Sequence, residues 1–257
     1  MPESVRVLLP MKQRVILCLI KLKLNLKYSA LSVLFSISPK VCGNYFRSTI
    51  QILARVLKGF VYFPTKEEIL KNMPKCFRKY WRTRIVLDCA EVPVEKCNCL
   101  KERIMTYSHY KGRYTIKFCV GVSPGGLITF LSRCFGGRAS DKRIVVHCGI
   151  LDKCEFGDGV MVDKGFMIEE ECVIRHLLLY RPPFLSKKKA LTKAEALKTA
   201  EIASARVHVE RKINQLRDFE ILVQPVSLKL IPYMDDILLV CGALANLSPP
   251  ILANDKF

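Results

Sequence analysis

The first third of the sequence has few acidic residues. Residues 1–87 contain 17 lysines and arginines but only three acids, whereas residues 88–257 contain 25 basic and 20 acidic residues. The two segments therefore carry net charges of +14 and +5, out of +19 for the whole chain. A positive field of this size favours a polyanionic partner, either nucleic acid or an anionic membrane surface. The asymmetry predicts a DNA-docking part followed by a domain that needs carboxylates; the alternative is a generic basic surface.

The sequence also lacks any Cys-x-x-Cys pair, although it contains 12 cysteines. Cys97 and Cys99 are the closest pair, and their spacing is too tight for a usual zinc knuckle. Most of the others lie in apolar runs, where cysteines behave as small hydrophobic residues in a reducing compartment. The pattern therefore does not favour a structural zinc site or a disulfide framework.

Long hydrophobic runs are missing as well. Residues 15–26 are apolar but are interrupted by Lys21 and Lys23, and no small-residue cleavage site follows them. The run at residues 237–247 is too short to span a bilayer. Half of the residues are hydrophobic and a quarter are charged, as in ordinary globular proteins. We expect a soluble, intracellular protein with no membrane partner.

Residues 11–60 have a helical pattern. A first helix is indicated by apolar residues at helical spacing: Val15, Leu19, Leu22 and Leu26. A second helix is predicted from Tyr28 to Phe35, and a third over about residues 40–58, with Ser38 as its N-cap and Pro39 at its first position. Two helices joined by a short turn, with basic residues on the second, predict a DNA-binding helix-turn-helix. The alternative is a small helical bundle with no DNA role.

Strand patterns begin after a connecting segment at residues 61–84, in which one more helix is expected. A β-branched run at residues 84–87 ends in Asp88, and two strands at 113–122 and 127–134 flank the turn Ser123-Pro124-Gly125-Gly126 as a hairpin. Helices and strands then alternate: a helix at 141–151, a strand at 159–162, a helix at 168–176, a strand at 177–180 and a long amphipathic helix at about 192–216. This succession predicts a mixed sheet with helices packed on it.

Three carboxylates stand at positions suited to a metal site. Asp88 and Asp163 each end a predicted strand, and Glu210 lies in the long helix beside an apolar stripe. Hard cations prefer oxygen ligands, and two Mg²⁺ ions held about 4 Å apart can cleave a phosphodiester bond. Spacing alone supports such a site weakly, because many chains of this length contain three acids so arranged.

Six motifs carry a family resemblance over about residues 11–250. They are LDCAEVPVEK (87–96), TYSHYKGRYTIKFCVGVSPGG (106–126), LSRCFGGRASDK (131–142), VMVDKGF (160–166), ARVHVERKINQLRDF (205–219) and CGALANLSPP (241–250). In this order and at these separations they resemble the DDE superfamily endonucleases of the PIF/Harbinger transposase group. The helical part resembles the helix-turn-helix that precedes these domains, at Leu31, Phe35, Ile37, Ser38, Tyr45 and Phe46.

The resemblance implies an α/β fold with an RNase H-like mixed sheet flanked by helices. A helix-turn-helix at residues 11–60 and a connecting segment at 61–84 would precede a catalytic domain at 85–250. Asp88, Asp163 and Glu210 would be the catalytic residues and the ligands of a divalent cation, Mg²⁺ or Mn²⁺. The implied activity is metal-dependent phosphodiester hydrolysis, extending to strand transfer.

The implied partner is double-stranded DNA, and a separate DNA-binding protein and a second copy of the chain are further candidate partners. The implied location is the nucleus. The motifs depart from the family at Ala90, where Thr is frequent, and at Lys164, where Arg is frequent; neither departure removes a metal ligand. Many relatives begin with a zinc-binding recognition domain, for which residues 1–10 leave no room. The alternative is therefore a domesticated or inactive transposon-derived DNA-binding protein. A third interpretation is a nucleic-acid-binding module without catalytic ancestry, and the six motifs make this interpretation unlikely.

A few other polar residues leave two interpretations open. Asp141, next to Ser140, is expected to cap a helix, or else to help order the metal site. The cluster Lys187, Lys188 and Lys189 is a solvated loop, or else a contact for a DNA phosphate. His208 is expected to pack or form a hydrogen bond rather than to bind metal.

Overall fold

The computed structural model describes residues 9–183 and 192–248, except for the side chains of His208 and Val209. The lysine cluster at residues 187–189 and the role of His208 therefore lie outside the described part of the chain. The six motifs lie within it, apart from the last two residues of the final one.

The three expected amino-terminal helices are present as α1 (Met11–Leu24), α2 (Tyr28–Phe35) and α3 (Pro39–Leu57). Helix α2 ends at Ser36, whose backbone is left-handed with φ 51°. The Ser38 hydroxyl then accepts a hydrogen bond from the Val41 amide at 3.4 Å, and Pro39 opens α3. Turn and cap chemistry therefore placed α2 and α3 within about one residue, whereas Leu26, expected in the first helix, lies beyond the end of α1.

The buried face of α1 differs from the expected one. Leu17, Cys18 and Leu22 are fully buried, whereas Leu19 is exposed and Lys21 is 7% exposed. Lys21 Nζ donates to the side-chain and backbone oxygens of the loop that follows, at 2.7 Å for Asn25 Oδ1 and 2.8 Å for the Leu26 carbonyl. Because these oxygens satisfy the ammonium group, the lysine tolerates burial on the face that meets α3.

The central sheet is mixed. Strand β1 (Thr83–Pro93) pairs antiparallel with β3 (Arg113–Val122) and parallel with β6 (Gly159–Met161), which pairs parallel with β7 (Leu178–Tyr180). The other edge of β3 is covered by three short strands in succession: β2 (Tyr107–Ser108), β5 (Phe135–Gly136) and β4 (Ile128–Leu131). The order β4-β3-β1-β6-β7 confirms the expected mixed sheet.

The predicted hairpin is present between β3 and β4. The Gly126 amide bonds to the Ser123 carbonyl at 2.8 Å, and Gly126 has a φ of 87°, which glycine adopts without strain. Two helices are shorter than expected. Helix α6 (Asp141–His147) stops before Gly149 with φ 72°, and α7 (Glu169–Ile174) stops before His176 with φ 53°. Both helices end shortly before a residue with positive φ, and hydrophobic periodicity in the sequence does not detect such a backbone conformation.

Helices cover both faces of the sheet. Helix α8 (Lys193–Arg217) and α9 (Met234–Leu247) pack on one face, with Val86, Val120 and Ile237 in a shared core. Helices α6 and α7 cover the other face, where Ile85 and Ile144 are fully buried. The expected apolar stripe of α8 is buried at each position whose side chain is described: Ile202, Ala205, Ile213 and Leu216.

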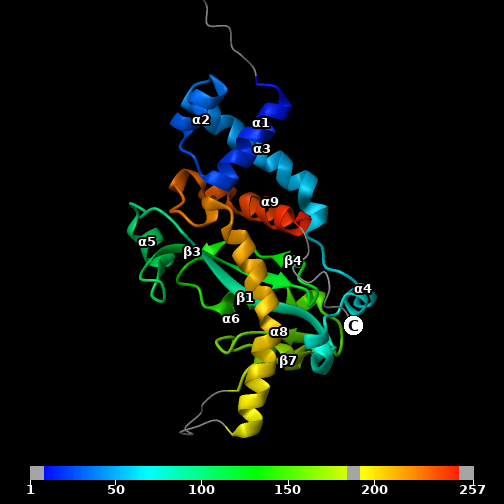
Figure 1. Cartoon of the computed structure of the whole chain (residues 1–257). Helices are drawn as coiled ribbons and strands as arrows, with labels where there is room; N and C mark the ends of the chain where they lie inside the picture. Colours follow the sequence, from blue (N-terminus) through cyan, green and yellow to red (C-terminus); the bar gives the residue numbers. More distant parts are fainter. Residues whose placement is uncertain (1–8, 184–191, 249–257) are drawn as a thin grey trace, which may run out of the picture.

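Helix α9 lies between the amino-terminal helices and the sheet (Figure 1), and the same core extends from α1 and α3 through α9 to β3. Sequence patterns did not predict this helix. With the 3₁₀ turn η5 (Leu228–Tyr233) before it, the apolar segment Leu228–Leu247 is 20 residues, longer than the run at residues 237–247 that the sequence pattern delimits. By length and composition it could cross a membrane, but half of it is buried in the fold, as expected of a core helix.

Shorter helices complete the chain. They are η1 (Lys58–Phe60), α4 (Lys66–Lys71), η2 (Lys75–Tyr80), α5 (Leu100–Thr106), η3 (Leu151–Lys153) and η4 (Glu220–Leu222). Helix α4 begins with a capping box, in which Thr65 and Glu68 bond each other's backbone amides. The 12 cysteines lie in the described residues and form no disulfide there, and six of them are buried, as expected of small hydrophobic residues.

Candidate active site

Asp88 and Asp163 occupy equivalent positions on neighbouring parallel strands. Val86 of β1 pairs with Met161 of β6, so each aspartate lies two residues beyond this pair. The expectation that Asp88 ends its strand is wrong, because β1 continues to Pro93 by pairing with β3. Strand β6 ends at Met161, so β1 extends beyond the end of its parallel neighbour. The two aspartates lie at this end of the β1–β6 pair, just beyond the last paired residues.

Both aspartates are held by the same local hydrogen bond. Asp88 Oδ1 accepts from the Cys89 amide at 2.8 Å, and Asp163 Oδ1 accepts from the Lys164 amide at 2.7 Å. A hydrogen bond from a backbone N–H group fixes the orientation of the carboxylate that accepts it. The two carboxylates are therefore oriented by their own chain.

Arg206 of α8 joins the two aspartates. Its Nη1 donates to Asp163 Oδ1 at 2.9 Å, and its Nη2 lies 3.8 Å from Asp88 Oδ2. The arginine is 8% exposed, and its Nε is buried without a hydrogen-bond partner. A nearly buried guanidinium thus supplies the positive charge that two neighbouring carboxylates require.

Glu210 is one helical turn beyond Arg206, so both residues are on the same side of α8. It is exposed and lines the same cleft as the two aspartates. The structure therefore brings all three expected residues to one cleft, with Asp88 and Asp163 sharing a cation. Within the described residues, however, no three His, Cys, Asp or Glu side chains are grouped closely enough to hold a metal ion.

Burial raises the pKa of the Asp88 carboxyl above its ordinary value. The nearby Arg206 charge and the Cys89 amide oppose the rise, while the negative charges of Asp163 and Asp141 add to it. Repulsion between carboxylates is present here, but desolvation is the larger cause.

The cleft around these residues has a volume of about 940 Å³ and is lined by groups of both charges. Its acids are Asp88, Glu91, Asp141, Asp163 and Glu210, and its basic residues are Lys111, Arg113, Lys117, Arg206 and Arg217. Tyr110, at the turn before β3, is 85% exposed at its margin. Carboxylates surrounded by cations and an exposed aromatic ring suit a polyanion whose phosphate approaches the acids.

A second ionic group lies deeper in the cleft. Lys117 Nζ is 2.7 Å from Asp141 Oδ1 and 3.8 Å from Glu91 Oε1, and the Thr115 hydroxyl donates to Glu91 Oε2 at 2.7 Å. Ser140, rather than Asp141, caps α6, by accepting from the Arg143 amide at 3.2 Å. Asp141 therefore belongs to the cleft, so the cap preferred from the sequence is wrong for this residue.

Sequence reasoning missed the roles of Arg206 and Lys117. Arg206 is four residues before Glu210, a spacing that places two helical side chains together. Lys117 lies directly opposite Glu91 on the antiparallel strand pair. To assign either role, one must know which face of α8 and which face of the sheet line the cleft. The four-residue spacing of Arg206 and Glu210 could nevertheless have indicated from the sequence that their side chains lie close together.

The donor set suits a hard divalent cation. Mg²⁺ and Mn²⁺ prefer carboxylate oxygens, and two hydrogen-bonded aspartates with a third carboxylate in the same cleft supply that chemistry. Arg206 already neutralises part of the same negative charge. Metal binding at these residues would therefore compete with the Arg206 ion pairs.

Comparison with known families agrees with this geometry. The family described as DDE superfamily endonuclease matches residues 87–246, a range that contains Asp88, Asp163 and Glu210. The helix-turn-helix of DDE superfamily endonuclease matches residues 7–59, which include α1, α2 and α3. No curated protein and no solved structure matches the chain. Since the first match covers more than half of the 257 residues, the chain belongs to the DDE superfamily endonucleases.

Proposed function

We propose that this protein is a metal-dependent DNA endonuclease of the PIF/Harbinger transposase group. Its reaction would be phosphodiester hydrolysis, with strand transfer as a second step. The observation that carries the proposal is the position of the two aspartates: Asp88 and Asp163 each lie two residues beyond a paired position on two neighbouring parallel strands. Glu210 lines the same cleft from the adjoining helix.

Asp88, Asp163 and Glu210 would hold Mg²⁺ or Mn²⁺. When bound, such ions activate the attacking water and stabilise the leaving oxygen. The backbone amides of Cys89 and Lys164 orient the two aspartates, and Arg206 balances their charge when no metal is present. For the aspartates to bind metal, the Arg206 guanidinium must move away, and the scissile phosphate is a suitable new partner for it.

Two surfaces would bind double-stranded DNA. Lys111, Arg113 and Arg217 line the cleft and are suited to the phosphates beside the scissile bond. On α3, Asn44 and Ser48 are exposed, and the partly exposed Arg47 is hydrogen-bonded to Asn44 at 2.7 Å. This polar face is the part of the helix-turn-helix suited to the major groove. A separate DNA-binding protein and a second copy of the chain are further proposed partners, and the nucleus is the proposed location.

Nicking of supercoiled plasmid by the full chain tests the proposal. We expect nicked circles with Mg²⁺ or Mn²⁺ and none with EDTA. Absence of nicking with both metals, in protein that still binds the plasmid, would refute the nuclease.

That result would support the second candidate function, a domesticated DNA-binding protein. One observation favours this alternative: the described residues contain no preassembled group of three metal ligands, and Arg206 occupies the charge site between the two aspartates.

A further inference from the structure

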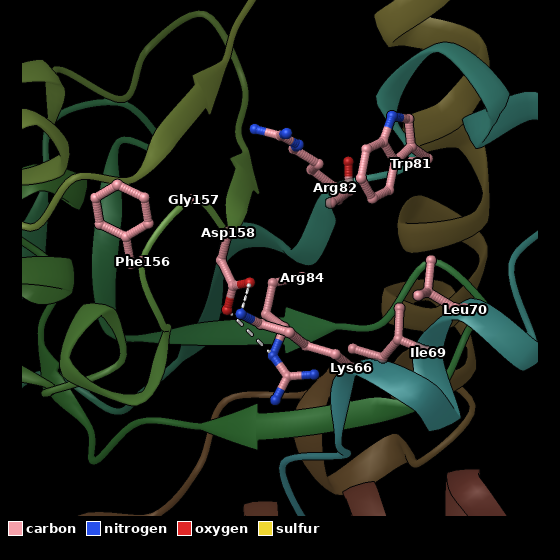
Figure 2. Close-up of a pocket in the computed structure, with 10 residues that line it drawn as sticks. Lys66, Ile69, Leu70, Trp81, Arg82, Arg84, Phe156, Gly157 and Asp158 are labelled. Atoms are coloured by element: carbon pink, nitrogen blue, oxygen red, sulfur yellow. Dashed lines mark ion pairs between the residues drawn. The ribbon is translucent and has the colours of Figure 1, made fainter.

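A second pocket opens at the other end of β1 from the acidic cleft. It has a volume of about 250 Å³ and is lined by the start of β1, by α4 and by the turn before β6 (Figure 2). Thr83 at this end and Asp88 are five residues apart on one strand, or roughly 17 Å at about 3.3 Å per residue. No residue lines both pockets. The second pocket is therefore a separate site.

A buried ionic group holds one side of this pocket. Asp158, which is 5% exposed, lies 3.2 Å from Lys66 Nζ and 3.4 Å from Arg84 Nε (Figure 2). Arg84 is 6% exposed, its guanidinium stacks 4.8 Å from the Phe63 ring, and its Nη1 has no hydrogen-bond partner. Glu155 also pairs with both cations, at 2.9 Å from Lys66 Nζ and 3.8 Å from Arg84 Nη2. Two carboxylates thus hold two cations side by side, and Arg84 retains a nitrogen without a hydrogen-bond partner.

Exposed aromatic rings stand around the same pocket. Trp81 is 52% exposed and Phe156 is 80% exposed, which is unusual for side chains of this size. The Arg82 guanidinium lies 5.0 Å from the Trp81 ring. Among the described residues, no acidic side chain pairs with Arg82. The pocket therefore combines free aromatic surface with a cation that lacks an acidic partner.

The segment that leads into the pocket is strongly basic in sequence, although Glu155 and Asp158 pair with Lys66 and Arg84, and Glu201 pairs with Lys79. Residues 69–87 contain no acid and six basic residues: Lys71, Lys75, Arg78, Lys79, Arg82 and Arg84. This segment connects the helix-turn-helix to the catalytic domain, and the functions proposed above do not use it. Basic residues interleaved with exposed aromatic rings are the equipment that proteins use to bind single-stranded nucleic acid.

We propose that this pocket binds an unpaired nucleotide of a DNA strand. The base would stack on Trp81, with Phe156 at the rim of the pocket, and the neighbouring phosphate would contact Arg82. A duplex is the wrong ligand, because its bases are already stacked on both faces and the pocket has room for a single base. The proposal relies on the proposed function only in taking DNA as the partner, and it does not require cleavage.

Trp81 is the only tryptophan in the sequence, so intrinsic tryptophan fluorescence reports directly on this pocket. The full chain is titrated in EDTA with an oligothymidylate of about eight nucleotides, on the order of one single-strand binding site. We expect saturable quenching, and much weaker quenching by a blunt duplex of equal length. Arg82→Ala and Phe156→Ala should each weaken the oligonucleotide affinity roughly tenfold. Lys229→Ala, which removes an exposed lysine from η5, should leave it unchanged.

Three results would overturn the proposal: no quenching, equal quenching by single strand and duplex, or Arg82→Ala and Phe156→Ala both binding like Lys229→Ala. Trp81→Phe keeps an aromatic ring and Trp81→Ala removes it, so anisotropy of a labelled oligonucleotide should show weaker binding for the alanine variant. Equal binding by these two variants would also contradict the stack. Quenching by the oligonucleotide in a chain that has no nicking activity would contradict the proposed nuclease function but not the proposed nucleotide-binding pocket. Loss of quenching with nicking intact would refute the pocket alone.

Discussion

The Nη1 atom of Arg206 lies 2.9 Å from the Oδ1 atom of Asp163, although 43 positions separate the two residues. The same guanidinium reaches to 3.8 Å from Asp88. A protein cation therefore balances the two aspartates in the absence of metal. This arrangement makes the aspartates and the arginine testable separately, because removal of an acid and removal of the cation should act in opposite directions on metal binding.

Removal of any one expected ligand should abolish metal-dependent nicking. Asp88→Asn, Asp163→Asn and Glu210→Gln keep the shape of the side chain but remove the charge that a divalent cation requires. Plasmid nicking with Mg²⁺ and with Mn²⁺ measures the effect, and circular dichroism checks that the fold is retained. DNA binding in EDTA should persist or strengthen, because a negative charge near the phosphate is lost.

Asp152→Asn is a matched control for these variants. Asp152 lies in η3, is exposed, pairs with Arg175 and is not part of the cleft, so nicking should be unchanged. Full nicking by Asp88→Asn, Asp163→Asn or Glu210→Gln would contradict the role of that residue.

Arg206→Ala should increase the affinity of the cleft for divalent cations. Loss of the guanidinium leaves Asp88 and Asp163 facing each other without a counter-charge, which a metal ion would then supply. We expect Mn²⁺ to bind at least roughly tenfold more tightly, allowing for solvent screening of the exposed Asp163. Calorimetric titration with Mn²⁺ measures this affinity.

In EDTA, Arg206→Ala should melt at a lower temperature than the wild type. Added Mn²⁺ should raise the melting temperature of the variant more than that of the wild type, because a ligand that binds the folded state stabilises it. Arg206→Lys retains the charge and serves as the control, with an affinity close to that of the wild type. Equal Mn²⁺ affinity in Arg206→Ala and the wild type would show that the arginine and the metal do not compete.

Arg47→Ala should weaken binding of the full chain to duplex DNA. Arg47 is on the polar face of α3, and a lost phosphate contact should reduce the slope of log K against log salt by about 1. Fluorescence anisotropy over a series of salt concentrations measures the slope. Lys153→Ala removes an exposed lysine of η3 and should leave the slope of log K against log salt unchanged. Binding that is insensitive to salt would show that the amino-terminal charge has no role in DNA affinity.

Asn246→Ala should destabilise the fold by about 2 kcal/mol, because one side chain bonds three backbone groups in two segments. Asn246 Oδ1 accepts from the Ile128 amide at 2.9 Å, and Nδ2 donates at 2.8 Å to the carbonyls of Ile128 and Phe60. Thermal melting should show a decrease of roughly 5 °C. Gln51→Ala removes an exposed amide from α3 and should have little effect. Equal melting temperatures for the two variants would show that these bonds do not stabilise the chain.

Local chemistry in the sequence determined most of the secondary structure. Ser38 and Pro39 placed the start of α3, and Ser123-Pro124-Gly125-Gly126 placed the β3–β4 hairpin. These features are predictable because caps and turns depend on neighbouring residues alone. The charge asymmetry and the order of the six motifs likewise needed no structure to indicate a DNA-handling enzyme of the DDE type.

Only the tertiary structure decided which residues meet. It placed Asp88 within a strand rather than at its end, buried Lys21, and inserted Arg206 between two aspartates from different strands. It also seated α9 between the helix-turn-helix and the sheet. Each outcome depends on pairing and packing between segments far apart in the chain. Propensity and periodicity are local, so they identify the elements, whereas the neighbours of each side chain are determined by how those elements pack.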